Sequence, residues 1–178
     1  MNADKKRRVL LFTGDGKGKT TAALGMVLRA RGHGIRALVV QFVKADPRTG
    51  EISALGEIPG ARIVQAGLGF IPPGTGEAQM REHRAAAERG LQEAAEAMAS
   101  GDWGLVVLDE ICYAVARGLL QERRVTEAVE LAAEKCSVVL TGRGATEGLV
   151  ALADTVTEMR CVKHAIDSGR KAQEGIEL

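Results

Sequence analysis

Short apolar runs rich in Val, Ile and Leu recur along the chain, and each is bounded by glycine or by charged residues. Runs of this length predict β-strands, and near-continuous apolarity predicts strands that are buried on both faces, as in a parallel sheet. The run at 61–66 is weaker because it alternates apolar and polar positions. The predicted strands are 9–12, 35–43, 61–66, 105–108, 137–141 and 155–159.

Segments with a helical period separate these runs. Between residues 77 and 100, Leu91, Ala94, Ala95 and Met98 share one face and charged residues cover the other, which predicts a long amphipathic helix. Regular alternation of strands and helices predicts an α/β fold, with an open, mostly parallel sheet and helices on both faces. The further predicted helices begin near Thr20 and cover 111–120, 125–135 and 147–152.

Residues 67–76 contain too many Gly and Pro for a helix or a strand. A loop of this length in a compact domain is often functional. We therefore expect this segment to contribute to a binding site.

The composition indicates one soluble domain, with 46% apolar residues, 26% charged residues and four prolines among 178 residues. We expect residues 1–178 to form it, with 160–178 as a C-terminal tail. A net charge of +1 gives no reason to expect nucleic acid or a membrane as a partner. Three widely spaced cysteines argue against a disulfide framework, so a cytoplasmic location is expected.

A glycine-rich segment joins the first predicted strand to the first predicted helix. Such a turn presents backbone N–H groups to phosphate, and the helix N-terminus and Lys19 add positive charge. The predicted nucleotide-binding residues are Gly14, Asp15, Gly16, Lys17, Gly18, Lys19, Thr20 and Thr21. We expect Lys19 to face solvent and phosphate, while a Gly-rich turn without a ligand is the alternative.

The segment departs from the usual P-loop pattern, G-x-x-x-x-G-K-[ST]. Position 13 is Thr and the first glycine is Gly14, so one residue fewer precedes Gly18-Lys19-Thr20. The fold class that follows from strand, loop and helix is nevertheless P-loop NTPase-like, of the RecA-like kind.

Asp109 and Glu110 follow the buried run 105–108. Carboxylates at the end of a strand beside a P-loop can reach Mg²⁺ together with the hydroxyl of Thr20, so we predict Thr20, Glu110 and Asp109 as metal ligands. Taken without the P-loop, the two acids are more typical of a solvated turn than of a metal site.

Two arginines are further candidates for nucleotide binding. Arg143 follows the predicted strand 137–141, and Arg29 lies in the helix beyond the P-loop. Each is also compatible with an ordinary surface position. The histidines are scattered, and none has a neighbour with which to form a metal site.

These segments, read in order, resemble the corrinoid adenosyltransferases, which act on cob(I)yrinic acid diamide and cob(I)alamin. The resemblance covers residues 8–178, and the ending is its most specific part. The matching segments are 13–21, 39–44, 106–111, 140–144, 153–156, 159–160, 162–165 and 171–176.

The resemblance implies that reduced cobalt(I) attacks the 5′ carbon of ATP and that triphosphate leaves as a unit. ATP and a corrinoid are then the substrates, with Mg²⁺ as cofactor and Lys19 as a catalytic residue beside the leaving triphosphate. It further implies a nucleotide reversed relative to ordinary P-loop enzymes, a homodimer, and a flavoprotein that supplies electrons.

The loop at 67–76 departs from the family. Members often carry Gly-Phe followed two residues later by Trp, aromatics that resemble a wedge displacing the lower axial ligand of cobalt. Here Gly69 and Phe70 are followed by Ile71 and Pro72, so the resemblance assigns a catalytic role to Phe70 alone. The short segment before the first strand gives no long N-terminal lid.

Two other functions remain open on the residues alone. A P-loop ATPase or phosphotransferase would cleave the β,γ bond of ATP and give ADP or phosphate. A non-enzymatic switch would bind ATP without turnover.

Overall fold

The computed structural model describes residues 7–176, and residues 1–6 and 177–178, at the two ends of the predicted domain and tail, lie outside the described part. Six parallel strands form one sheet in the order β3-β2-β4-β5-β1-β6. The predicted α/β class with an open parallel sheet is confirmed. The strands are β1 (Val9–Thr13), β2 (Ala37–Gln41), β3 (Ala61–Gln65), β4 (Leu105–Asp109), β5 (Ser137–Thr141) and β6 (Thr155–Glu158).

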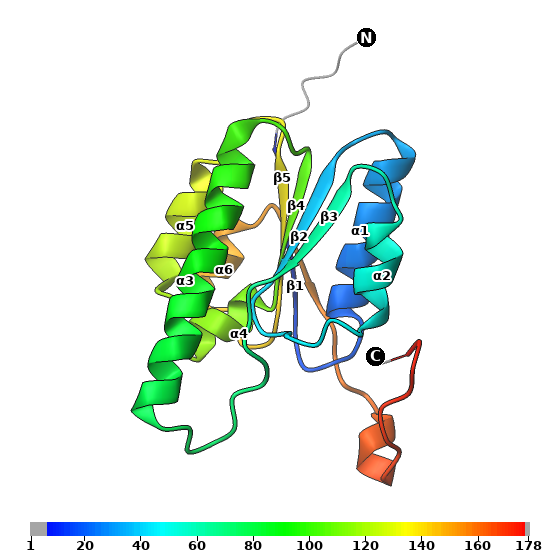
Figure 1. Cartoon of the computed structure of the whole chain (residues 1–178), viewed down its shortest axis with the longest axis vertical. Helices are drawn as coiled ribbons and strands as arrows, with labels where there is room; N and C mark the ends of the chain where they lie inside the picture. The colour runs from blue at the N-terminus through cyan, green and yellow to red at the C-terminus, as the bar shows by residue number, and fades with distance from the viewer. Residues whose placement is uncertain (1–6, 177–178) are drawn as a thin grey trace.

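Helices cover both faces of the sheet, which makes a three-layer molecule (Figure 1). One face carries α1 (Lys19–Gly32) and α2 (Gly50–Gly56). The opposite face carries α3 (Glu77–Ser100), α4 (Ile111–Ala116), α5 (Glu122–Glu130) and α6 (Glu147–Leu152). Among the described residues, no helix is long and apolar enough to cross a membrane.

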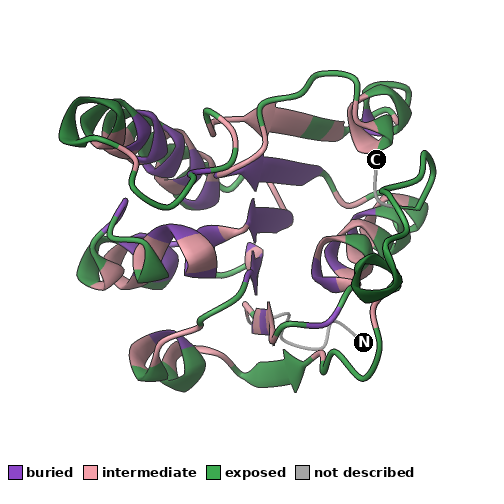
Figure 2. Cartoon of the chain, turned by 90° about the horizontal axis from the view of Figure 1, so that it is seen from below, coloured by how far each residue is buried: buried purple, intermediate pink, exposed green. Residues whose placement is uncertain are grey.

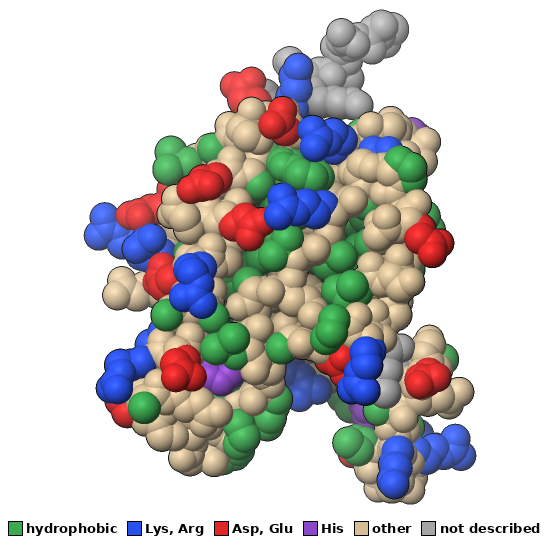
Figure 3. Space-filling view, viewed as in Figure 1, with side chains coloured by type: hydrophobic (Ala, Val, Ile, Leu, Met, Phe, Trp, Pro, Cys, Tyr) green, Lys and Arg blue, Asp and Glu red, His purple; other side chains and the backbone are tan. Residues whose placement is uncertain are grey.

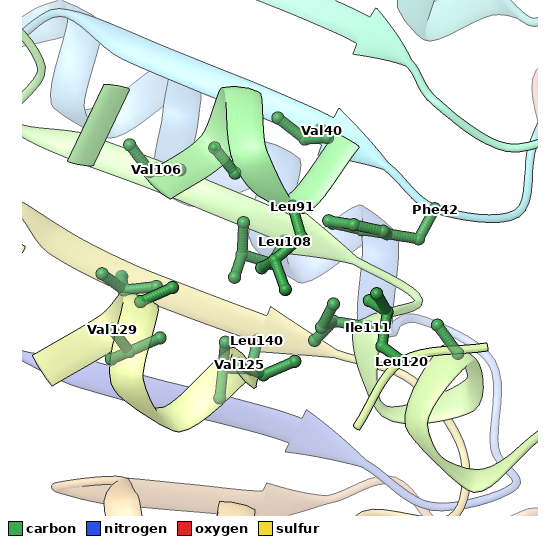
Figure 4. Packing of buried hydrophobic residues seen from close by; sticks show 14 of the residues in the cluster. Val40, Phe42, Leu91, Val106, Leu108, Ile111, Leu120, Val125, Val129 and Leu140 are labelled. Carbon is green, nitrogen blue, oxygen red and sulfur yellow. The ribbon is translucent and has the colours of Figure 1, made fainter. Parts of the chain in front are cut away.

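Alternate residues of the central strands face two separate cores, which explains their near-continuous apolarity. Val40 and Leu108 meet Leu91 of α3 and Phe42 on one face (Figure 4). Val39 and its neighbours meet Val27 of α1 on the other. Burying both faces removes these side chains from water and stabilises the central strands most.

The strands at the two edges of the sheet are more exposed. All four residues of β6 are exposed and β3 is only partly buried, whereas every residue of β2 and β4 is buried (Figure 2). An edge strand has one neighbour instead of two. The weaker apolar pattern at 61–66 reflects the edge position of β3.

Several element boundaries differ from the predicted ones. The helix predicted over 111–120 ends at Ala116, where the chain turns through Gly118 with φ of 67°. Helix α5 covers Glu122–Glu130 instead of the predicted 125–135. Its start was missed because the first turn is charged and the apolar face begins only at Val125. Helix α2 and a 3₁₀ turn at Ala165–Ser168 were not predicted, because each is too short to show a period.

The carboxyl ends of all six strands meet at one edge of the sheet, which is the lower edge in Figure 1. The P-loop follows β1, the long loop 66–76 follows β3, and Asp109-Glu110 ends β4. The C-terminal tail leaves β6 at the same edge. Ligands of open α/β sheets bind at this edge, so the fold gathers the predicted site residues where a site is expected.

Candidate active site

The P-loop is held against the segment that leaves β6. The Gly16 N–H donates a hydrogen bond of 2.6 Å to the Met159 carbonyl. A Cβ atom at Gly16 would lie 2.6 Å from that oxygen, so a larger residue would push the two segments apart. Gly18, with φ of 118°, turns the chain into α1 in a conformation that L-residues rarely adopt.

Lys19 begins α1, and only 6% of it is exposed. Its Nζ donates to the carbonyls of Gly14 and Gly16, each at 2.7 Å. The expectation that Lys19 faces solvent is therefore wrong, because the ammonium lies inside the loop. Burial lowers the pKa of Lys19, while the Glu110 carboxylate opposes that shift.

Thr20, one residue into α1, is joined to the end of β4. Its hydroxyl donates to Asp109 Oδ1 at 2.8 Å, and the Thr141 hydroxyl donates to the same oxygen at 2.8 Å. Asp109 is fully buried, and Thr141 also accepts the backbone N–H of Glu110 at 2.9 Å. The structure thus brings the predicted Thr20 and Asp109 into direct contact.

Glu110 has a left-handed backbone, with φ of 62°, and among the described residues it is the one non-glycine with positive φ. Backbone strain of this kind persists where the surrounding structure enforces it, often at functional sites. Burial raises the pKa of the Glu110 carboxyl, and the neighbouring Asp109 carboxylate raises it further. A nearby cation would relieve both effects.

A cavity of about 740 Å³ opens over the P-loop, a size typical of ligand sites. In the space-filling view, the lower edge of the molecule is indented between the start of α3 and the C-terminal tail (Figure 3). The residues that line the cavity are Gly16, Lys17, Gly18, Lys19, Thr20, Thr21, Leu24, Val43, Lys44, Gly50, Glu51, Ala54, Leu55, Phe70, Glu110, Tyr113, Arg143, His164, Gly175 and Ile176.

Most of the predicted nucleotide-binding residues lie at this cavity, but three do not line it. Gly14 and Asp15 lie in the adjoining loop, where Arg143 Nη2 donates to the Asp15 carbonyl at 3.3 Å. Arg29 is exposed in the last turn of α1, ten residues beyond Lys19 and therefore about 15 Å away along the helix. The structure does not bring Arg29 to the site.

A second cavity of about 710 Å³ adjoins the first. Phe70 borders both cavities and is 71% exposed, whereas the next residue, Ile71, is 2% exposed. Ile71 therefore attaches the loop to the core and leaves Phe70 at the cavities. The second cavity is lined by Val43, Lys44, Ala45, Asp46, Pro47, Arg48, Thr49, Gly69 and Phe70.

The sequence did not predict every residue at the site. Glu51 of α2 forms an ion pair with Lys44, and both line the first cavity. The C-terminal tail returns to the P-loop, where Lys17 Nζ donates to the Ile176 carbonyl. Gln41, which is fully buried at the end of β2, was also missed. Its polar side chain directly after an apolar run was a signal that could have marked it, although not its partners.

The donor set suits a hard cation that is shared with phosphate. Among residues 7–176, no three His, Cys, Asp or Glu side chains form a cluster able to hold a metal ion by themselves. Mg²⁺ is usually bound by one or two carboxylates together with substrate phosphates. Glu110 and the Thr20 hydroxyl line the cavity and fit that pattern, whereas the predicted ligand Asp109 is buried behind Thr20. Cys112 is buried, which raises the pKa of its thiol to about 12, so it is a core residue and not a ligand of this site.

A parallel α/β sheet with a P-loop after β1 and two carboxylates at the end of β4 defines a P-loop nucleotide-binding protein. The chain belongs to one family of this class. The model of the ATP:corrinoid adenosyltransferases BtuR/CobO/CobP matches residues 5–178, so the resemblance noted in the sequence is confirmed.

Individual relatives agree with the family over nearly the whole chain. The corrinoid adenosyltransferase of Pseudomonas aeruginosa is 43% identical over 177 residues, which cover 98% of this chain and 85% of the relative. That of Escherichia coli K12 is 42% identical, with 98% and 87% covered. Corrinoid adenosyltransferase CobA of Salmonella typhimurium is 42% identical, with 95% and 84% covered.

Proposed function

We propose that this chain transfers the 5′-deoxyadenosyl group of ATP to cobalt(I) of a corrinoid and releases triphosphate. Membership of the ATP:corrinoid adenosyltransferase family over residues 5–178 carries this proposal. The relatives with 42–43% identity bear the same activity in their names, which supports a role in cobalamin biosynthesis. The residue roles that follow rest on the geometry of the site.

The P-loop would hold the triphosphate, which is the leaving group. Lys19 lies inside the loop with its ammonium directed at the Gly14 and Gly16 carbonyls, so a short movement of this flexible side chain would place it on phosphate. Backbone N–H groups and the lysine then stabilise the charge that builds as the C5′–O bond breaks. Cobalt(I) is itself the nucleophile and has no proton to lose, so the reaction needs no general base.

The loop is one residue shorter than the usual P-loop, and its Gly16 N–H is already bonded to Met159. The family resemblance implies a nucleotide bound in the reverse direction, which would direct its ribose toward the second cavity, and the altered loop is compatible with that direction. Arg143 borders the first cavity, where it would contact phosphate or ribose.

Mg²⁺ would be held by Glu110 and the Thr20 hydroxyl, both of which line the cavity. Asp109 is buried behind Thr20 and accepts a hydrogen bond from its hydroxyl, so Asp109 would act by orienting Thr20. When bound, the ion supplies positive charge to the triphosphate.

The corrinoid would occupy the second cavity, with Phe70 at the boundary between the two substrates. A largely exposed aromatic side chain on a loop anchored by Ile71 supports a role toward a ligand. Phe70 would supply the apolar bulk that displaces the lower axial ligand of cobalt. Pro72 is exposed, and we propose no such role for it.

The family resemblance also suggests properties of the whole protein. We propose that it acts as a cytoplasmic homodimer, receives electrons from a flavoprotein, and forms one domain of which 160–178 is the tail. Each of these is a separate proposal, and the activity does not depend on them.

The proposed function is tested by incubating the protein without oxygen with ATP, Mg²⁺ and cobalamin that has been reduced chemically to cobalt(I). The expected products are adenosylcobalamin and triphosphate in equal amounts. Formation of ADP or phosphate without a cobalt–carbon bond would instead identify an ATPase or phosphotransferase.

A further inference from the structure

Four polar side chains form a row across the sheet beneath the two cavities. Gln65, Gln41, Asp109 and Thr141 are the last residues of β3, β2, β4 and β5, which are consecutive neighbours in the sheet. Gln41 is paired in register with both Gln65 and Asp109. The side chains therefore lie next to one another at the carboxyl edge of the sheet.

Hydrogen bonds join every neighbouring pair in this row. The Gln65 Nε2 donates to Gln41 Oε1 at 3.1 Å, and Gln41 Nε2 donates to Asp109 Oδ2 at 3.3 Å. Thr141 completes the row with its 2.8 Å bond to Asp109. Gln41 Nε2 also donates to Glu51 Oε1 at 3.1 Å, so one amide group bridges two carboxylates.

Only a carboxamide suits the position of Gln41. Carboxylates accept hydrogen bonds and cannot donate them, so the two acids fix which end of the amide faces them. The amide has two N–H donors for Asp109 and Glu51, and its oxygen remains free to accept from Gln65. Because Gln41 is fully buried, any donor or acceptor left without a partner here would cost free energy.

The row ends at a different cavity on each side. Through Asp109 it reaches the Thr20 hydroxyl in the nucleotide cavity. Through Gln65 it reaches the Asp46 carbonyl at 3.0 Å, in the segment that lines the second cavity. Glu51 adds a branch to Lys44, which borders both cavities.

We propose that Gln41 is a positioning residue for both substrates: its amide holds the Thr20–Asp109 pair and the 44–51 segment in one fixed arrangement. This inference rests on the proposed function, because it takes ATP and the corrinoid as the occupants of the two cavities. Gln41 touches neither substrate and acts through the side chains that do.

The test measures KM for ATP and for cobalt(I) cobalamin, together with kcat, in Gln41→Met. Methionine keeps the length of the side chain and removes all three hydrogen bonds. Both KM values are expected to rise about tenfold or more, the scale of losing hydrogen bonds to charged groups. A merely structural role would reduce the folded fraction, which lowers apparent kcat and leaves both KM values unchanged.

Three matched variants separate the possibilities. Val39→Ala creates a cavity two residues earlier in β2, at a fully buried site with no polar contact, and should lower the melting temperature without changing either KM. Thr141→Val removes the bonds of the Thr141 hydroxyl to Asp109 and to the Glu110 N–H at the nucleotide end, and should raise the ATP KM alone. Gln65→Leu removes the bonds at the other end and should raise the corrinoid KM alone.

The inference is overturned if Gln41→Met raises only one KM, or lowers kcat with both KM values unchanged. If Gln41→Met does not fold, a double-mutant cycle of Thr141→Val and Gln65→Leu replaces it. Although Gln65→Leu alone should leave the ATP KM unchanged, the double variant is expected to have a different ATP KM from Thr141→Val alone, because the row couples the two side chains through Gln41 and Asp109. Additive effects would also overturn the inference. Failure of the proposed function is distinct, because the unaltered protein would then form no adenosylcobalamin.

Discussion

At the scale of single residues, the site places carboxylates close together in a partly buried setting. Asp109 and Glu110 are consecutive, Glu51 lies one side chain away through Gln41, and Lys19 opposes them from the P-loop. Burial and the Asp109 carboxylate raise the pKa of Glu110, while Lys19 opposes that shift. Such an arrangement favours a bound cation over the empty site.

Glu110→Gln is expected to reduce Mg²⁺-dependent turnover by roughly 100-fold, because it removes a charge beside the leaving triphosphate. Asp154→Asn is the matched control. Asp154 accepts the Val9 N–H at 2.8 Å at the opposite end of the sheet, and asparagine can keep that bond. Turnover measured across a Mg²⁺ titration should separate the variants, and equal losses would mean that Glu110 is not the metal carboxylate.

Glu51 gives a pH dependence of stability. Burial alone would raise the pKa of Glu51, but hydrogen bonds from Lys44, its own backbone N–H and Gln41 outweigh burial, so the pKa lies below its ordinary value of 4.5. A lowered carboxyl pKa stabilises the fold above the unfolded pKa, and this stabilisation is lost as the pH falls through the folded pKa.

Glu51→Gln should therefore cost about 1 kcal/mol at pH 7 and progressively less below about pH 4.5. Urea unfolding of both proteins at pH 7 and pH 4 provides the measurement. A difference in unfolding free energy that does not change with pH would show that the Glu51 charge contributes nothing.

The residues of the site differ in how far the sequence could predict them. Lys19, Thr20 and Glu110 belong to local patterns with a known chemical purpose, and each lines the cavity. Gln41 and Thr141 meet Asp109 only when β2, β4 and β5 align, and Glu51 reaches Gln41 from α2, so no spacing along the chain reveals these contacts. The burial of Lys19 was mispredicted because the loop carbonyls that surround it are a feature of tertiary structure.

At the scale of elements, two neighbouring residues of the loop at 67–76 have different positions. Ile71 is buried in the core and Phe70 is exposed at both cavities. The sequence predicted that this segment forms a loop and identified Phe70, but not that Ile71 anchors the loop. Helix α2 was missed for a related reason, since seven residues with one buried leucine give no detectable period.

Phe70→Ala should cripple activity when a mild biological reductant supplies electrons, yet spare much of it when cobalt(I) is prepared in advance. The physical reason is that the proposed wedge makes cobalt easier to reduce, whereas cobalt(I) prepared in advance needs no further reduction. The melting temperature should stay unchanged because Phe70 is 71% exposed.

Ile71→Ala is the control for loop attachment. Removal of this buried side chain should cost about 2–4 kcal/mol and lower the melting temperature, with similar losses in both assays. If Phe70→Ala behaved in the same way, Phe70 would be a structural residue and the wedge would be refuted.

At the scale of the whole molecule, the parallel sheet brings segments that are far apart in sequence to one edge. The P-loop, the 44–51 segment, Glu110, Arg143 and the tail at Ile176 surround one cavity. The alternation of strands and helices predicted this edge, because parallel strands all end on the same side. The return of the tail to Lys17 had no signal in the sequence, since it depends on an exposed segment with little regular structure.

The central claim is that the P-loop holds ATP for attack at the 5′ carbon and leaves the β,γ bond intact. The most direct test replaces ATP by its β,γ-imido analogue, in which that bond resists hydrolysis, in the assay with prepared cobalt(I) cobalamin. Adenosylcobalamin should form, with imidotriphosphate released intact. Absence of adenosylcobalamin from the analogue, together with ADP as the product from ATP, would contradict the account.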